Sequence, residues 1–151
     1  MGKTFLINVI SKWADMILRE KGTDPLDPIV LLITPTGKSA SLIGGSTMHS
    51  ALDCRFETRY NPLAPERLGT FRKLFEHLQL VIIDEMSMVS SDSLYDIDLR
   101  LCDILIYKEP FSGRTVMVNG ELLQLPSIKG RPIMIKVSAL FQSFVVRLIP
   151  T

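Results

Sequence analysis

Two neighbouring carboxylates, Asp84 and Glu85, are the residues of this sequence best suited to chemistry. They directly follow the apolar run Leu-Val-Ile-Ile at positions 80–83. A short apolar run that ends in charge is typical of a strand buried on both faces of a parallel sheet. Open α/β sheets bind ligands at the carboxyl ends of such strands. There the first acid could hold Mg²⁺ and the second could take a proton from an attacking water. The alternative is two solvated acids at a turn.

The first residues of the chain suggest a partner for these acids. Gly2-Lys3-Thr4 matches the tail of the phosphate loop G-x-x-x-x-G-K-[ST] and is followed by apolar residues at helical spacing. In such a loop the lysine reaches the terminal phosphates, the threonine hydroxyl binds Mg²⁺, and the helix directs its positive end at them. A Gly-Lys-Thr tripeptide also occurs by chance. The rest of the loop and the strand that feeds it would precede residue 1, so we expect a sheet that lacks its first strand.

Composition limits the classes of protein to consider. The 151 residues are 46% hydrophobic and 22% charged, which fits one globular domain with a substantial core. The net charge of +1 provides no overall basic field, so any nucleic-acid binding must use a local groove. The charges at Lys3, Lys12 and Asp15 exclude a signal peptide and a membrane span at the start. Two cysteines without paired spacing fit a reducing intracellular compartment.

The elements expected to position these residues alternate between strands and helices, which predicts a parallel α/β sheet. Strands are expected at 29–33, 80–83, 114–119 and 145–149. Helices are expected after Thr4 and at 39–43, 66–79 and 139–144, with a further helix capped by Ser90 or Ser91. Residues 44–50 are expected to form a loop, and 53–65 an exposed connection.

Several segments together resemble the motifs of Pif-type DNA helicases, including the related helicases of Helitron transposons. The segments 2–6, 34–40 and 44–50 resemble the opening motifs, and 82–89 resembles the Walker B segment. The segments 110–113 and 120–126 are similar to the next motif. Their order and spacing also agree, and they cover nearly the whole chain. The resemblance implies a RecA-like P-loop NTPase lobe, the first of two in a superfamily 1 motor that moves 5′ to 3′ on single-stranded DNA with ATP.

The resemblance also implies residue roles. Gly2, Lys3, Thr4 and Asp84 would bind ATP, with Thr4 and Asp84 on Mg²⁺. Glu85 would position or deprotonate water, and Gln124 would sense the γ-phosphate. The DNA track would contain Thr34, Thr36, Gly37 and His49. Hydroxyls beside a glycine allow close approach to a phosphodiester, and an imidazole can stack on a base.

Each of these residues has a simpler interpretation. The segment 34–37 could be only a strand-to-helix turn, and His49 an ordinary loop or core histidine. Gln124 could be a surface amide. The sequence also departs from the resembled pattern: Glu121 stands where aspartate is usual, Ser127 replaces a proline, and Asn119 replaces an apolar residue or glycine.

We therefore expect residues 1–151 to form a single helicase lobe truncated at both ends, with the second RecA-like lobe absent. By resemblance it would serve DNA repair, recombination and telomere maintenance in the nucleus or mitochondrion, without a membrane partner. Two alternatives stay open. One is an inactive helicase remnant that at most binds nucleotide or DNA weakly. The other is a P-loop kinase or switch ATPase, which would not explain the segments 34–37 and 124–126.

Overall fold

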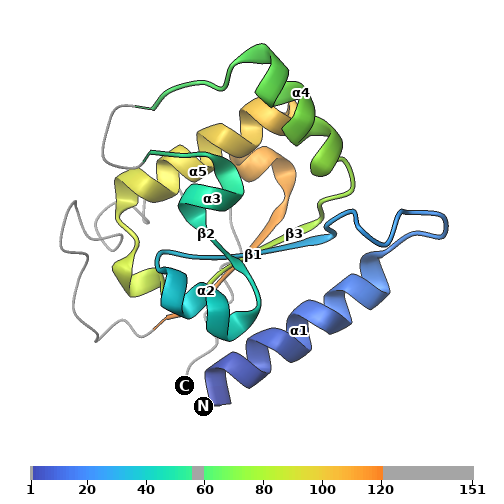
Figure 1. Ribbon diagram of the computed structural model, residues 1–151, viewed down its shortest axis with the longest axis vertical. Coiled ribbons are helices and arrows are strands. Elements are labelled where there is room, and N and C mark those ends of the chain that lie inside the picture. Colours follow the sequence, from blue (N-terminus) through green and yellow to red (C-terminus); the bar gives the residue numbers. More distant parts are fainter. Residues whose placement is uncertain (1, 56–59, 121–151) are drawn as a thin grey trace.

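The computed structural model describes residues 2–55 and 60–120, which build a parallel sheet flanked by helices (Figure 1). The strands are β1 (Val30–Thr34), β2 (Ser46–Thr47), β3 (Leu80–Ile83) and β4 (Thr115–Val118), in the order β2-β1-β3-β4. The helices are α1 (Gly2–Leu18), α2 (Gly37–Ile43), α3 (Met48–Leu52), α4 (Pro65–Leu74) and α5 (Ser91–Leu105). Two 3₁₀ turns, η1 (Met86–Met88) and η2 (Pro110–Gly113), complete the list. All strand pairs are parallel, which confirms the predicted fold class.

The sheet has apolar layers on both faces because its inner strands alternate their side chains between two clusters. Val81 and Ile83 of β3 join the larger cluster beneath α3 and α5, whereas Leu80 and Ile82 pack against Ile7 of α1. All four residues of β3 are buried. This explains why the strand reads as an unbroken apolar run. Figure 1 shows α3, α4 and α5 on one side of the sheet and α1 on the other.

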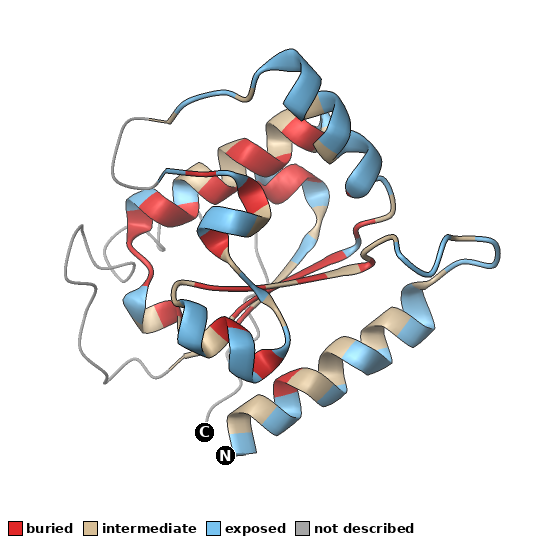
Figure 2. Cartoon of the chain, in the orientation of Figure 1, coloured by how far each residue is buried: buried red, intermediate tan, exposed pale blue. Residues whose placement is uncertain are grey.

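Helix α1 confirms the expected helix but buries little of its apolar surface. Ile7 is its one buried residue, and Ile10 and Ala14 are partly buried against the sheet. The side chains that suggested an apolar stripe are largely exposed, with Trp13 62% and Met16 69% accessible (Figure 2). The helical period was therefore predicted correctly, but the buried face lies to one side of the predicted stripe.

Two expected elements are corrected by the structure. Residues 44–50 are not a simple loop, because β2 and the start of α3 lie within them, and His49 is therefore a helical residue. Helix α4 ends at Leu74 rather than near residue 79. Phe75 and Leu78 beyond it are buried in the large cluster, so they pack as a connection into β3. The elements expected at 139–144 and 145–149 lie outside the described residues.

The sheet is continuous across its four strands, so the expected lack of a first strand leaves no gap between them. Within the described residues, β4 pairs on one side only, with β3. Of the connection from Asp53 to α4, residues 53–55 and 60–64 are described, and most of them are exposed or half-buried, although Cys54 is buried. In the described part of the chain, no helix is long and apolar enough to cross a membrane.

Candidate active site

The carboxyl ends of β3 and β4 bring Asp84 together with Asn119. The two strands are in parallel register, with Ile83 opposite Val118, so the residues that follow them lie side by side. The amide Nδ2 of Asn119 donates a hydrogen bond of 2.7 Å to Oδ1 of Asp84. Both residues are half-buried, so the carboxylate is shielded but still reachable. Sequence reasoning noted Asn119 only as a departure from the resembled pattern; its position one residue after a strand parallel to the 80–83 strand was the signal that could have found it.

Glu85 adopts a backbone conformation that is unusual for a residue with a side chain. Its φ of 58° and ψ of 41° lie in the left-handed region, which costs about 1–2 kcal/mol for a non-glycine residue. Such strain persists where the surroundings impose it and is concentrated at functional sites. Here the next residue is held in place, since the backbone N–H of Met86 donates to the carbonyl oxygen of Asn119 at 2.9 Å.

A chain of hydroxyls connects Glu85 to helix α2. Thr36 caps this helix, because its Oγ1 accepts a hydrogen bond from the backbone N–H of Ser39 at 3.2 Å. The Thr36 hydroxyl donates to Oγ of Ser39 at 2.9 Å, and the Ser39 hydroxyl donates to Oε1 of Glu85 at 3.3 Å. Asp84 is thus held by the amide of Asn119, and Glu85 by the hydroxyl of Ser39. Ser39 was not among the predicted site residues.

At Gly120 the segment that follows β4 passes close to the turn that follows β3. A Cβ atom built there would lie 2.8 Å from the backbone nitrogen of Met86 and 3.2 Å from that of Ser87. Only glycine allows the backbone to pass at this distance. The residue therefore fixes the position of the turn that follows Glu85.

Gly2, Lys3 and Thr4 form the first turn of α1, which leaves backbone N–H groups without helical partners. Lys3 and Thr4 are half-buried. Figure 1 shows α1 running opposite to β1, so that its N-terminus lies toward the α2 end of the sheet. Helix α1 contacts both α2 and β1. The positive end of α1 thus lies toward the edge of the sheet at which β3 ends and Asp84 and Glu85 follow.

The four residues predicted to lie on a DNA track fall into two groups. Gly37 and His49 are exposed, and Thr36 is half-buried. Thr34 is completely buried at the end of β1, and its Oγ1 has no hydrogen-bond partner among the described residues. The strand thus directs the Thr34 side chain into the protein, and its place on the DNA track stays a prediction. Gln124 lies outside the described residues.

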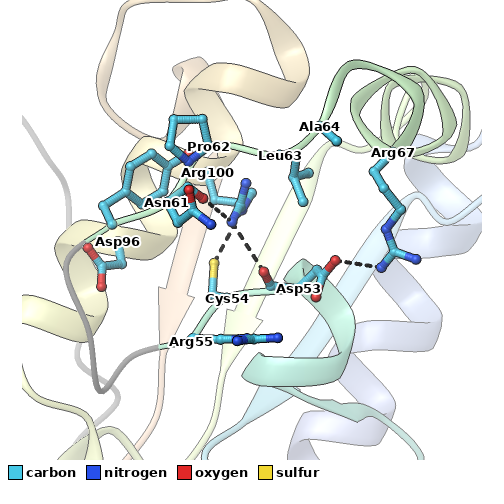
Figure 3. Close-up of a pocket in the computed structure, with 11 residues that line it drawn as sticks. Asp53, Cys54, Arg55, Asn61, Pro62, Leu63, Ala64, Arg67, Asp96 and Arg100 are labelled. Carbon is cyan, nitrogen blue, oxygen red and sulfur yellow. Dashed lines mark hydrogen bonds and ion pairs between the residues drawn. The ribbon is translucent and has the colours of Figure 1, made fainter.

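A separate cavity of about 290 Å³ lies between the connection after α3 and helix α5 (Figure 3). Its wall contains Arg100, which is only 2% exposed. The guanidinium donates to the carbonyl oxygens of Asp53 at 3.1 Å and Asn61 at 3.0 Å, and to Sγ of Cys54 at 3.4 Å. Arg100 therefore ties both ends of the connection to α5. No pattern in the sequence predicts this buried arginine.

Burial raises the pKa of two groups beside Arg100, the Cys54 thiol and the Tyr60 phenol. Desolvation raises the pKa of the Cys54 thiol, although the nearby Arg100 opposes the shift. Desolvation, followed by the hydrogen bond to Asp103, raises the pKa of the Tyr60 phenol, which lies against the guanidinium. Both groups therefore stay neutral at physiological pH. None of the residues that line this cavity has a predicted role in phosphate or metal binding.

Comparison with known proteins agrees with this geometry. The sequence model of the family described as PIF1-like helicase matches residues 1–147. The chain belongs to this family. An uncharacterized protein, 030L, of Invertebrate iridescent virus 6 is 35% identical over 135 residues, which are 85% of this chain and 24% of the viral protein. The ATP-dependent DNA helicase Pif1 of Bdellovibrio bacteriovorus is 30% identical over 131 residues, 84% of this chain and 27% of the relative.

A solved structure shares the fold. The structure described as Pif1 helicase from Bacteroides in complex with ADP-AlF3 and ssDNA has a TM-score of 0.62 and 23% identity, and the match covers 94% of this chain and 35% of that one. The predicted RecA-like fold of a Pif-type helicase is thereby confirmed. The chain spans about a quarter of the length of the curated relatives that it matches.

Two of the predicted site residues, one after β3 and one in the first turn of α1, carry side chains of the kind that bind Mg²⁺. Asp84 and Thr4 offer hard oxygen ligands, which Mg²⁺ prefers. Within residues 2–55 and 60–120, no group of three or more His, Cys, Asp or Glu side chains is placed to hold a metal ion. Mg²⁺ usually takes one or two protein ligands and completes its shell with phosphates and water.

Proposed function

We propose that this chain is the first RecA-like lobe of an ATP-dependent DNA helicase and binds Mg·ATP at the carboxyl end of its sheet. The observation that best supports this function is the pair of acids at the end of the central strand β3. Asp84 is held by Asn119, and Glu85 is held in a strained conformation beside Ser39. A carboxylate oriented by an amide, next to a second acid at the carboxyl end of a buried strand, suits metal-dependent hydrolysis of a phosphate.

The proposed roles follow from the chemistry of each group. Lys3 and the first-turn N–H groups of α1 bind the β- and γ-phosphates. Thr4 and Asp84 hold Mg²⁺, which neutralises charge on the phosphates when it is bound. Glu85 orients the attacking water and accepts its proton. Gln124 is proposed to sense the γ-phosphate.

Single-stranded DNA is proposed to lie across the α2 and α3 end of the sheet. Gly37 and His49 are exposed there, and Thr36 is half-buried at the cap of α2. Backbone at Gly37 can approach a phosphodiester, and the imidazole of His49 can stack on a base. The link from Thr36 through Ser39 to Glu85 joins this surface to the proposed hydrolytic acid.

The finer functional assignments are part of the proposal. We propose 5′-to-3′ movement and service in DNA repair, recombination and telomere maintenance, in the nucleus or mitochondrion. A second RecA-like lobe would complete the ATP site, since an arginine supplied from such a partner contributes several orders of magnitude to turnover in related ATPases. We therefore expect nucleotide and DNA binding from this chain, and little turnover from it alone.

The two histidines of the chain provide a matched test of the DNA surface. Fluorescence anisotropy with a labelled oligothymidine would measure single-stranded DNA affinity for the parent, His49→Ala and His77→Ala. His77 lies away from this surface, 3.8 Å from Asp27. Loss of one stacking contact predicts roughly tenfold weaker binding for His49→Ala, and no change for His77→Ala. A folded parent chain that does not bind the oligonucleotide, or equal losses in both variants, would contradict the proposed surface.

A further inference from the structure

Asn119 is fixed by three hydrogen bonds to residues 83–86, immediately around the two acids. Its backbone N–H donates to the carbonyl oxygen of Ile83 at 2.8 Å, and its carbonyl oxygen accepts from Met86 at 2.9 Å. Its side-chain amide donates to Asp84 at 2.7 Å. The first two bonds continue the sheet and can be made by any residue other than proline. The third depends on the asparagine side chain.

In the third hydrogen bond, Asn119 is the donor and Asp84 the acceptor. An ionised carboxylate only accepts hydrogen bonds, so the asparagine must present its NH₂ group to Asp84. Hydrogen bonds to a charged acceptor are stronger than neutral ones, and at 2.7 Å this bond lies at the short end of the N–H···O range. One oxygen of Asp84 is thereby engaged, which restricts rotation of the carboxylate and leaves the other oxygen available. An apolar residue or glycine at position 119 could not do this.

We propose that Asn119 is a positioning residue of the divalent cation site: it orients the Asp84 carboxylate, and the affinity of the site for Mg²⁺ depends on it. This inference rests on the proposed function, because it takes Asp84 as the cation ligand. Partners that hydrogen-bond to metal ligands typically contribute 10- to 100-fold in metal affinity. Asn119 also accepts the hydrogen bond from Met86 that anchors the turn carrying Glu85. The positions of both acids therefore depend on the residue that follows β4.

The competing interpretation is that Asn119 has only a structural role and holds the turn after β3 against the end of β4. Two variants separate the interpretations. Asn119→Leu keeps a similar shape but removes the amide. Val118→Ala removes buried methyl groups from the neighbouring residue, which is 8% exposed, and destabilises β4 without touching Asp84. A purely structural role predicts that cation affinity follows the loss of stability in both variants.

The test is calorimetric titration of the whole chain with ATP, once with Mg²⁺ and once with excess EDTA, for the parent and both variants. The strengthening of ATP binding by Mg²⁺ is the quantity to compare, and unfolding midpoints are recorded in parallel. We expect Asn119→Leu to reduce this strengthening by about tenfold or more while ATP binding in EDTA is unchanged. Val118→Ala should retain the full Mg²⁺ effect at lower stability.

The outcomes separate this inference from the proposed function. If the parent binds Mg·ATP and Asn119→Leu retains the Mg²⁺ effect, the positioning role is refuted and the proposed function stands. An equal loss of the Mg²⁺ effect in Val118→Ala also refutes it, in favour of the structural role. If the folded parent shows no Mg²⁺-dependent binding, the proposed function and the role of Asn119 both fail.

Discussion

Replacing Gly120 by alanine tests whether the turn that carries Asp84 and Glu85 is held against the end of β4. The new methyl group would lie 2.8 Å from the backbone nitrogen of Met86, whereas ordinary contacts begin near 3.4 Å. The Met86 backbone must therefore retreat by about 0.6 Å, because it cannot rotate away as a side chain would. Such a shift would stretch the 2.9 Å hydrogen bond from Met86 to Asn119 toward its limit.

The expected cost follows from overpacking a fixed backbone contact. Forcing an extra methyl group into a well-packed site costs about 1–3 kcal/mol, which for a chain of this size lowers the midpoint of thermal unfolding by roughly 2–4 °C per kcal/mol. Gly69 provides a matched control. It lies inside α4, and a Cβ there meets no atom within 4 Å. Gly69→Ala should therefore stabilise the chain by about 0.5–1 kcal/mol through helix propensity.

Urea unfolding of the parent and the two alanine variants, followed by circular dichroism, would measure these changes. The same substitution is expected to have opposite signs at the two glycines, with Gly120→Ala the less stable by about 1.5–4 kcal/mol. A Gly120→Ala variant as stable as the parent would refute the close approach of the turn to β4.

Three further predictions concern other parts of the structure. Arg100→Leu should destabilise the chain by about 1–3 kcal/mol for each of the Asp53 and Asn61 carbonyl oxygens that loses its donor. Arg67→Leu loses an exposed ion pair and should cost less than about 1 kcal/mol in the same urea assay. Similar costs would contradict the anchoring role of Arg100. Ser39→Ala should leave Mg·ATP affinity without DNA within about twofold, but it should reduce the change in that affinity caused by single-stranded DNA, because it removes the link from Thr36 to Glu85. An unchanged effect of DNA in calorimetric titration would exclude that link. Burial raises the folded-state pKa of the Cys54 thiol above its ordinary 9.0, so the folded chain keeps this proton to higher pH than the unfolded chain. The free energy of unfolding should therefore fall as the pH rises above 9. Cys54→Ala should flatten that part of the profile, and an unchanged slope would contradict the shift.

The strands and the positions of the acids could be predicted from the sequence because they depend on local pattern. The run 80–83 has to be buried on both faces, and Asp84 and Glu85 then have to lie at its carboxyl end. The cap of α5 at Ser90 was also predictable, since its hydroxyl satisfies a free N–H of the first turn. These features need no knowledge of distant contacts.

The features that were missed depend on contacts between segments far apart in the chain. Asn119 and Asp84 meet only because β4 pairs with β3, and Ser39 meets Glu85 only because β1 lies on the other side of β3. The buried face of α1 was misjudged because this helix carries apolar residues on several sides. The burial of Thr34 was not predicted, because a motif does not state which way the last residue of a strand points.

Titration of Mg·ATP into the purified chain, with Lys3→Ala and Asp84→Asn as variants, tests the nucleotide site most directly. Micromolar binding that requires Mg²⁺ and is lost in both variants is the predicted result, because the first turn of α1 and the end of β3 would then bind the same phosphates and cation. Absence of binding by a folded parent chain, or binding that survives both substitutions, would contradict the assignment of the nucleotide site to this end of the sheet.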